Sequence, residues 1–395
     1  MVRFIHFSDS HIGINPYRLF DSETGDNPRT IDFLNSLKSV VDSAVEERVD
    51  FVVHSGDLFD SLRVSTRAIR YCFEALRPLS DAEIPFYVIA GNHDRPQSIT
   101  ADSPVRLLSF LDHVYPISKL GSHAVRTTGD TTVVVHGISY VGEPLEYVPQ
   151  RGKSLVQNTS GHYNILLLHQ TIAEADAGGE RTLMAWADEP KIPLRDLPEG
   201  FQYVGVGHVH KNQVLELPDN TAVRVALPGA GERVDFGEKN SNVGYFMVEE
   251  EAGELVPTYR PLPTRPMVEL RLNFDRPSGE EVREALRVVF QEQDITGKLV
   301  GVRVTGELDL TLRRHFHPKH LKELGKEALH VTLLDRRANW HTRDGVVSLQ
   351  EESQWMFPPE DELRMALEKR EGLTENQREL LREKGLSIMR EVEEG

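Results

Sequence analysis

The stretch FVVHSGDLFD, residues 51–60, joins a short apolar run to a Gly-Asp turn. Its first residues are typical of a buried β-strand, and Asp57 follows where that strand would end. An amphipathic helical pattern, TRAIRYCFEALRPL, begins shortly afterwards at Thr66. A strand, a turn that carries a carboxylate and a helix, in this order, predict an α/β unit with polar groups at the carboxyl end of a strand.

The same alternation continues on both sides of this stretch. VRFIHFSD predicts a strand before it, IPFYVIAGNHD predicts a strand and a turn after it, and PRTIDFLNSLKSVVDSAVEE has a helical period. Later runs such as TTVVVHGIS, YNILLLHQ, FQYVGVGHVH and VGYFMVEEE are rich in strand formers. We therefore expect an α/β domain over residues 1–261, in which helices pack on sheets and the later strands pair in mixed directions.

The remainder of the chain divides into three parts. The proline-punctuated segment PLPTRPMVELRLNF predicts a boundary near residue 262, and alternating strands and helices predict a small α/β domain over residues 262–340. Residues 341–358 are expected to form a linker, and residues 359–395 to form two amphipathic helices. Because two such helices cannot bury their apolar faces alone, they either fold back on the body or dock on a partner.

Composition limits the class of protein. The formal net charge of −17 argues, by itself, against a general nucleic-acid binder. The chain has one cysteine, Cys72, which excludes an intramolecular disulfide and argues against a thiolate metal site. No apolar run approaches the roughly 18 residues of a membrane span. These features predict a cytoplasmic protein.

Five short motifs share one form, an apolar strand whose carboxyl end carries Asp, His or Asn. They are SDSH (Asp9, His11), GDLFD (Asp57), GNHD (Asn92, His93), LLLHQ (His169) and GHVH (His208, His210). A lone strand-end histidine is usually structural and a lone Gly-Asp is usually a turn. Since ligands of open α/β sheets bind at the carboxyl ends of strands, five such ends predict a shared site. Imidazole and carboxylate ligands suit Mn, Fe or Zn.

The order DxH, GDxxD, GNHD, H and GHxH resembles the signature of the calcineurin-like metallophosphoesterases. GDLFD, GNHDRP and the layout of the chain are similar to the DNA double-strand-break repair nuclease family of meiotic recombination eleven and SbcD, in its archaeal form. The motifs span residues 9–210, and the rest of the chain fits the family in layout only. The resemblance implies a nuclease subunit that acts as an exonuclease on duplex ends and as an endonuclease on single strands or hairpins.

The resemblance also implies roles for the site residues. Two Mn²⁺ ions are expected per chain, although Fe, Zn or Mg also fit the ligand types. Each ion takes one histidine of GHVH, and the two ligand sets are Asp9, His11 and His210, and Asn92, His169 and His208. Asp57 would bridge the ions, and His93 would contact the scissile phosphate. Asp94 would either orient His93 or cap a turn.

Two short segments depart from known motifs. Some archaeal relatives carry histidine where this chain has Asp60, so the role of that position is left open. GKS at Gly152–Ser154 resembles the end of a phosphate-binding loop, but that motif needs glycine where Tyr147 stands. We therefore expect no ATP site on this chain.

Basic side chains gather in LRRHFHPKHLKELGKEAL and the following DRR. Such a cluster is either a solvated helix face or a surface that follows the DNA backbone, and the family's DNA-binding capping domain favours the second reading. The expected contacts are Arg313, Arg314, Lys319, Lys322, Arg336 and Arg337. The polar loop with Tyr17 and Arg18, and the nearby Arg29, presents the same alternative between a DNA contact and a solvated surface.

The resemblance further implies partners. A homodimer is expected through helices of the first domain, with Ile31–Val45 and Thr66–Leu76 as candidates. The terminal helices are expected to bind a coiled-coil ABC-type ATPase (Rad-fifty-like or SbcC-like). The protein is expected to be associated with the chromosome. Two alternatives remain. A phosphatase or small-molecule phosphodiesterase could use the same metal site, although the phosphoprotein branch usually shows GDxVDRG and GNHE. A non-catalytic scaffold would lack some of the ligands.

Overall fold

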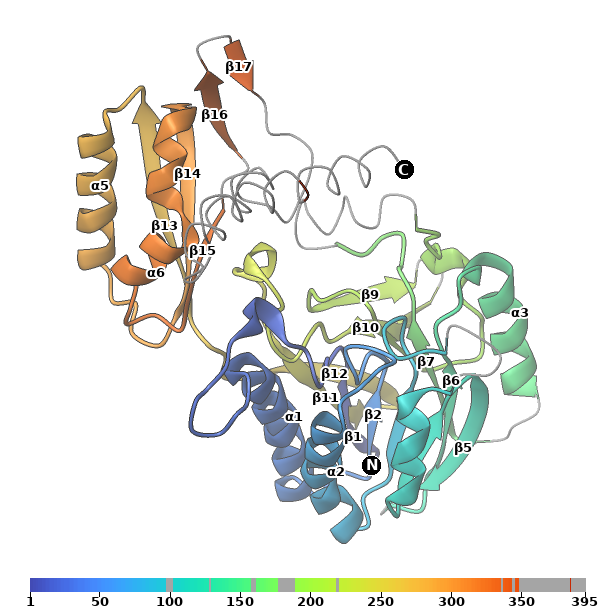
Figure 1. Ribbon diagram of the computed structural model, residues 1–395. Coiled ribbons are helices and arrows are strands. Elements are labelled where there is room, and N and C mark those ends of the chain that lie inside the picture. Colours follow the sequence, from blue (N-terminus) through green and yellow to red (C-terminus); the bar gives the residue numbers. More distant parts are fainter. Residues whose placement is uncertain are drawn as a thin grey trace. The chain divides into compact units, whose positions relative to one another are not determined.

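The computed structural model describes residues 1–96, 102–127, 129–157, 161–176, 189–217, 220–334, 337–342, 345–347 and 384. The chain forms two compact units, Met1–Arg265 and Pro266–Gly395 (Figure 1). The division falls after Arg265, whereas the sequence predicted a boundary near residue 262. The helical pair predicted at residues 359–395 lies outside the described residues, apart from residue 384.

The first unit contains two six-stranded sheets. The first has the order β12-β11-β1-β2-β3-β4. Its parallel strands are β1 (Arg3–Phe7), β2 (Phe51–His54), β3 (Phe86–Ile89) and β4 (Val114–Ile117). Antiparallel pairing adds β11 (Gly244–Glu251) beside β1, and β12 (Glu254–Pro261) beyond it. A late strand therefore completes the sheet next to the first strand of the chain.

The second sheet has the order β5-β6-β7-β8-β10-β9. Its four central strands are parallel, namely β6 (Thr132–Ile138), β7 (Tyr163–His169), β8 (Tyr203–Gly207) and β10 (Asn220–Leu227). The antiparallel edge strands are β5 (Leu120–Arg126) and β9 (Gln213–Leu217). The mixed pairing expected for the later strands is present.

Alternating side chains of β1 pack into two different cores, one on each face of the first sheet. Ile5 and Phe7 belong to a core that includes residues of the helices α1 (Pro28–Glu46) and α2 (Thr66–Asp81). Phe4 packs instead between the sheets, in a core that includes Ile165 and Leu167 of β7. A further core covers the other face of the second sheet beneath α3 (Pro144–Gln157). Two sheets packed face to face and covered by helices confirm the expected α/β domain, in which helices pack on sheets.

Local sequence determines where the two main helices begin. Asn27 precedes α1 and its side chain accepts a hydrogen bond from the Arg29 amide, with Pro28 in the first helical turn. Ser65 precedes α2 and accepts from the Ala68 amide. Short 3-10 helices lie in the connections: η1 (Pro16–Arg18), η2 (Pro104–Phe110), η3 (Leu194–Asp196) and η4 (Phe236–Glu238). The GKS sequence lies inside α3, in a helix and not in a phosphate-binding loop.

The second unit is a smaller sheet with helices. β14 (Leu299–Asp309) lies at its centre and pairs in parallel with β13 (Met267–Asp275), β15 (His330–Leu333) and β16 (Arg337–Thr342). Its core contains Leu286 of α5 (Gly279–Gln291) and Leu321 of α6 (Pro318–Leu324), which follows η5 (Leu310–Phe316). The end of β16 and all of β17 (Gly345–Val347) form a hairpin within the range we expected to be a linker. None of the described helices has both the length and the apolar composition that crossing a membrane requires.

Candidate metal centre

The predicted ligands come from the carboxyl ends of strands in both sheets of the first unit. Asp9 and His11 follow β1, Asp57 follows β2, and Asn92 follows β3. His169 is the last residue of β7, and His208 and His210 follow β8. A hydrogen bond joins the two sheets at this point, because the backbone amide of His208 donates to the Asp9 carboxylate at 3.1 Å. One edge of the sandwich therefore gathers side chains from five strand ends.

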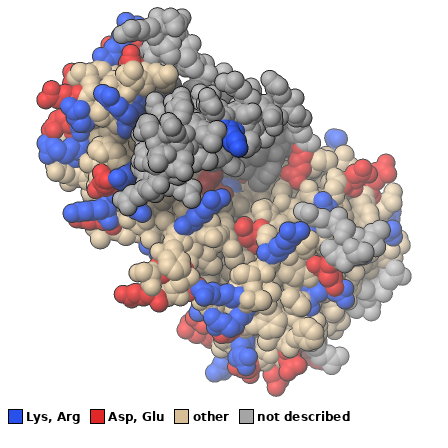
Figure 2. Space-filling model, in the orientation of Figure 1, with Lys and Arg blue, Asp and Glu red and all other residues tan. Residues whose placement is uncertain are grey.

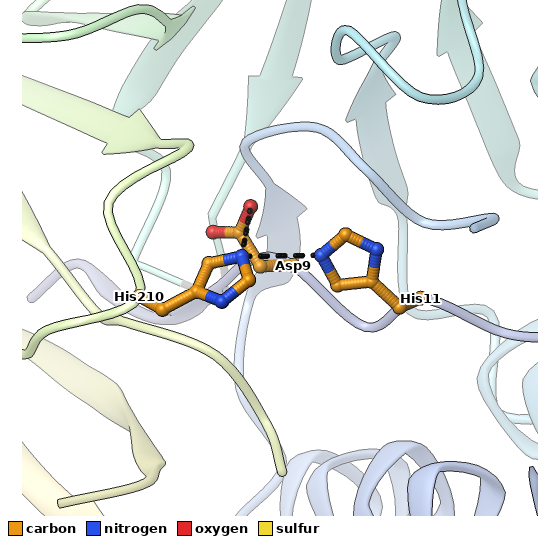
Figure 3. A group of neighbouring side chains, drawn as sticks. All are labelled: Asp9, His11 and His210. Carbon is orange, nitrogen blue, oxygen red and sulfur yellow. Dashed lines mark hydrogen bonds and ion pairs between the residues drawn. The ribbon is translucent and has the colours of Figure 1, made fainter. Parts of the chain in front are cut away.

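The first group consists of Asp9, His11 and His210, whose ligand atoms lie within 4.8 Å of one another. Figure 3 shows these three side chains turned toward a common point. The Nε2 atoms of His11 and His210 are 3.2 Å apart, and Nε2 of His210 is 3.8 Å from Asp9 Oδ1. Two imidazole nitrogens and a carboxylate that face each other in this way are suited to share one cation.

The second group contains Asp57, His169 and His208, again with ligand atoms within 4.8 Å. Nε2 of His169 lies 3.2 Å from Asp57 Oδ2 and 3.0 Å from Asn92 Oδ1. Nδ1 of His208 lies 2.9 Å from the same Asn92 oxygen. These contacts bring the expected ligands of the second ion together.

Asp57 lies between the two groups. It also forms a set with His11 and His93 whose ligand atoms lie within 4.8 Å. Its Oδ1 accepts the backbone amide of His93 at 2.9 Å, and Oδ2 is directed toward His169. One carboxylate thus reaches residues of both ligand sets, as a bridging ligand must.

Backbone conformation places these ligands. Asp9, His11, Asp57 and His208 all have positive φ, at 51°, 42°, 55° and 84°. Residues other than glycine seldom adopt this conformation, and each such residue carries a cost of about 1–2 kcal/mol. Four of the seven proposed ligands share this conformation, and strain of this kind is often found at functional sites.

Glycines allow the strand ends to approach each other. A Cβ atom on Gly56, where φ is 101°, would lie 2.3 Å from Nδ1 of His169. A Cβ atom on Gly91 would lie 2.1 Å from Oδ1 of Asp57. The glycines of GDLFD and GNHD therefore serve the site directly by leaving room for a ligand from a neighbouring strand.

The side chain of His93 is partly exposed beside the ligand groups. Its side chain is 43% exposed, and its Nδ1–H donates to the carbonyl of Asp60 at 2.9 Å, so that Nε2 is the free nitrogen. Nε2 lies 3.9 Å from Asp57 Oδ2. The Asp60 carboxylate itself lies 3.3 Å from Nδ1 of His11, without the alignment of a hydrogen bond.

Of the two alternatives given for Asp94, the structure shows the turn cap. Its carboxylate accepts hydrogen bonds from the amides of Gly91 at 2.7 Å and Phe59 at 3.1 Å. The ring of His93 is oriented by Asp60 instead. Asp94 therefore caps a turn and ties GNHD to GDLFD, and burial together with the Asp57 carboxylate raises its pKa to about 7.

Two histidines of the site favour protonation when no metal is bound. Burial disfavours the charged imidazole of His169, but the Asp57 carboxylate outweighs burial and raises the pKa of His169 to about 9. For His210, burial is outweighed by Glu238 and Asp9, and the pKa rises to about 10. A cation that binds here must displace these protons.

Two glutamates that the sequence did not reveal contact the GHVH histidines. Glu189 Oε2 lies 2.9 Å from Nε2 of His208, and Glu238 Oε1 lies 2.7 Å from Nδ1 of His210. Glu189 lies in a loop and Glu238 ends the short helix η4, so neither follows a strand as the other site residues do. No motif or spacing in the sequence marks them.

The expected DNA contacts divide into three groups. Arg314, Lys319 and Lys322 of η5 and α6 are exposed, and Arg313 is partly buried. Arg337 is described only as backbone in β16, and Arg336 lies outside the described residues. Figure 2 shows Lys and Arg side chains interspersed with Asp and Glu on the face in view.

Arg29 is not available for DNA. Its side chain is fully buried, where it pairs with Asp32 at 2.7 Å and lies 3.5 Å from Glu232. It also donates to the carbonyl of Arg233. A buried cation needs such partners, and here they hold α1 against the loop after β10. The expectation that Arg29 lies on a DNA-facing surface or a solvated loop was wrong.

The donor set fits divalent cations. It contains imidazole nitrogen, carboxylate oxygen and one amide oxygen, and it contains no thiolate. Such ligands suit Mn, Fe or Zn in sites with open coordination positions. The described residues thus hold the groups that a pair of cations would need, although the ligand types alone do not select the metal.

Comparison with known proteins gives the family. Residues 2–212, more than half of the chain, match the model named calcineurin-like phosphoesterase. A protein of Methanococcus maripaludis named DNA double-strand break repair protein Mre11 is 30% identical over 262 residues, which cover 62% of each chain. Proteins of the same name from Saccharolobus solfataricus and Thermoplasma acidophilum are 29% and 27% identical, over 57% and 78% of this chain and 54% and 77% of theirs.

The chain spans less than two thirds of the length of the first two of these relatives. The family match, in contrast, covers every strand end that contributes to the candidate metal centre. The fold and the ligand types agree with it. The chain belongs to the calcineurin-like phosphoesterase family.

Proposed function

We propose that this protein is the Mn²⁺-dependent nuclease subunit of a DNA double-strand-break repair complex. It hydrolyses phosphodiesters as an exonuclease on duplex ends and as an endonuclease on single strands or hairpins. The observation that carries this proposal is the convergence of seven predicted ligands and His93 in one centre. The relatives named Mre11 support DNA as the substrate.

The ligands divide between two ions in this proposal. The first ion is held by Asp9, His11 and His210, the second by Asn92, His169 and His208, and Asp57 bridges them. When bound, such a pair of cations binds the phosphate oxygens, activates a water and stabilises the leaving oxygen. The ligand atoms of Asp9, His11 and His210 lie within 4.8 Å of one another, which supports the first set. Asn92 Oδ1 lies 3.0 Å from Nε2 of His169 and 2.9 Å from Nδ1 of His208, which supports the second.

His93 acts on the substrate. Its Nδ1–H is held by the Asp60 carbonyl, which leaves Nε2 free to contact the scissile phosphate or to give a proton to the leaving oxygen. Its exposure supports direct contact with the substrate. The backbone carbonyl of Asp60 orients the ring, so this contact does not depend on the side chain at position 60.

Partner surfaces form the second part of the proposal. DNA contacts Arg313, Arg314, Lys319 and Lys322, and the C-terminal residues 359–395 bind a coiled-coil ABC-type ATPase. The first unit forms a homodimer. The apolar residues of α1 and α2 are largely taken up by the core, whereas Leu107 and Phe110 of η2 are 38% and 80% exposed, which supports η2 as part of the dimer surface.

The test uses the purified chain on end-labelled linear duplex DNA with Mn²⁺, with Mg²⁺ and with a chelator. We expect shortening of the DNA in Mn²⁺ that disappears with the chelator and in Asp57→Asn. Asp42→Asn, a matched change of an exposed carboxylate on α1, retains full activity. The label that is lost first gives the polarity of cleavage.

Two results would redirect the proposal. If DNA stays intact while a phosphomonoester is hydrolysed, the centre belongs to a phosphatase. If neither DNA nor a small phosphodiester is hydrolysed in any metal, this chain is not an enzyme by itself, and a scaffold role takes precedence. The full ligand set argues against the scaffold, because loss of catalysis ordinarily removes ligands.

A further inference from the structure

Glu189 and Glu238 occupy equivalent places on two histidines that are one residue apart. His208 turns Nδ1 toward Asn92 and presents Nε2 to Glu189 at 2.9 Å. His210 turns Nε2 toward His11 and presents Nδ1 to Glu238 at 2.7 Å. In both rings, one nitrogen faces the centre and the other faces a carboxylate.

This arrangement decides which nitrogen of each ring carries the hydrogen. A carboxylate can only accept, so the N–H of the neutral imidazole stays on the nitrogen that faces the glutamate. The lone pair of the other nitrogen is then directed into the centre, where a cation would bind. The two rings use opposite nitrogens for this purpose, and each glutamate fits the orientation of its own ring.

The Glu189 contact is fixed by further hydrogen bonds. The side chain is only 16% exposed. Its Oε1 accepts from the Tyr140 hydroxyl at 2.9 Å, and Oε2 accepts from Thr171 Oγ1 at 3.0 Å. Thr171 lies two residues after His169, so Glu189 is joined to both strands of the second sheet that supply ligands.

The Glu238 contact has separate supports. This side chain is also 16% exposed, and its Oε2 accepts the amide of Val234 at 2.7 Å. The buried Arg29 stabilises the loop that carries Val234, because it donates a hydrogen bond to the carbonyl of Arg233. Within the described part of the chain, Glu189 and Glu238 are held by different partners, so each can be changed without direct disturbance of the other.

We propose that Glu189 and Glu238 are positioning residues, each dedicated to one of the two metal ions. Glu238 orients His210 for the ion that Asp9 and His11 also hold. Glu189 orients His208 for the ion that Asn92 and His169 also hold. This inference rests on the proposed function, because it takes over the division of ligands between two ions.

The test is calorimetric titration of the full metal-free chain with Mn²⁺. We expect two binding events in the unchanged protein. Glu238→Ala weakens one event about 10- to 100-fold and leaves the other unchanged, and Glu189→Ala does the reverse. The glutamine variants of both positions show smaller losses, because an amide oxygen can accept the same hydrogen bond. Glu74→Gln, at an exposed residue of α2, changes neither event.

Each binding event is assigned to a particular ion in an Asn92→Ala background, in which binding of the second ion is weakened. In that background we expect Glu238→Ala to reduce the remaining Mn²⁺ affinity and Glu189→Ala to have no effect on it. Thermal unfolding of each metal-free variant shows whether it is folded. If an alanine variant does not fold, the comparison is made with its glutamine variant.

Two outcomes would overturn the inference, and a third would overturn its basis. If each variant weakens both events equally, the glutamates are general structural residues. If neither event changes, they do not position the histidines. If the unchanged protein binds fewer than two Mn²⁺ ions, the two-ion centre of the proposed function fails, which is a separate result.

Discussion

Gly91 leaves the space that the Asp57 carboxylate occupies. A Cβ atom on Gly91 would also lie 2.5 Å from the backbone nitrogen of Asp57, so the backbone would have to move together with the side chain. The glycine of GNHD is therefore a requirement of the neighbouring strand end.

Gly91→Ala is expected to displace Asp57. Overpacking at such a contact costs about 1–3 kcal/mol of stability. Because Asp57 reaches both ligand sets, we expect Mn²⁺ affinity to fall about 10-fold or more for both ions. Calorimetry and thermal unfolding measure the two effects. Gly142→Ala is the matched control, since nothing lies within 4 Å of its added methyl group. Equal behaviour of the two variants would contradict this account of Gly91.

The raised pKa values of His169 and His210 predict how the stability of the metal-free protein depends on pH. In the folded chain the pKa of His169 is about 9 and that of His210 about 10, against an ordinary value of 6.5 for histidine. Since the folded state binds protons more tightly, this contribution is complete below pH 6.5 and disappears as the pH rises through 9 to 10.

The melting temperature of chelator-treated protein should therefore fall between pH 6.5 and 10. With excess Mn²⁺ the trend should weaken or reverse over the lower part of this range, because the metal competes with protons for the same nitrogens. Differential scanning calorimetry at constant ionic strength measures both curves. A metal-free curve that is flat across this range would mean that the two imidazoles are neutral already.

At the scale of elements, strands were predictable because apolar runs ended in motifs with one form. The strands that carry ligands, β1, β2, β3, β7 and β8, were all expected from such runs. The edge strands β5, β9 and β12 were not, because an exposed edge does not require a continuous apolar run. The hairpin of β16 and β17 was not predicted for a similar reason, since NWHTRDGVV contains mainly polar residues and few apolar ones.

The candidate site was predictable to the same extent. Side chains that follow a strand could be placed from the order of strands, and they do come together. Glu189 and Glu238 could not, because the position of a loop depends on what it packs against and not on a period in its own residues. Arg29 shows the opposite error: it belongs to a polar stretch, but Asp32 and Glu232 draw it into the interior.

The helix α5 allows a test of the second unit as a separate element. Leu286 is fully buried in the core of this unit. Leu286→Ala should lower its free energy of unfolding by about 2–5 kcal/mol. Hydrogen exchange of β13 and β14 measures this loss, and hydrolysis of a small phosphodiester by the first unit should remain unchanged. Arg283→Ala, an exposed change on the same helix, is the control. A parallel loss of hydrolysis would mean that the two units depend on each other.

At the scale of the whole molecule, the net charge of −17 opposes the approach of DNA. The DNA binding that we propose then depends on local basic side chains. The slope of log affinity against log salt concentration reports how many of them contact phosphates. We expect Arg314→Ala and Lys322→Ala each to reduce the slope of that plot by about 1. Lys38→Ala, at an exposed position of α1, should leave it unchanged. Unchanged slopes in the first two variants would identify η5 and α6 as an ordinary solvated surface.

The position of β11 has a consequence for synthesis of the chain. β1 lies between β2 and β11, with Arg3 opposite Glu249. Once the chain has been synthesised as far as residue 210, every proposed metal ligand is present. The strand β11, which pairs with β1 in the first sheet, has not yet been made. Strand β1 can pair on its second side only after residues 244–251 have been made. Because β1 and β11 are far apart in the sequence, their pairing is a slow step. We therefore expect the proposed hydrolytic activity to arise only after residues 244–251 have paired with β1.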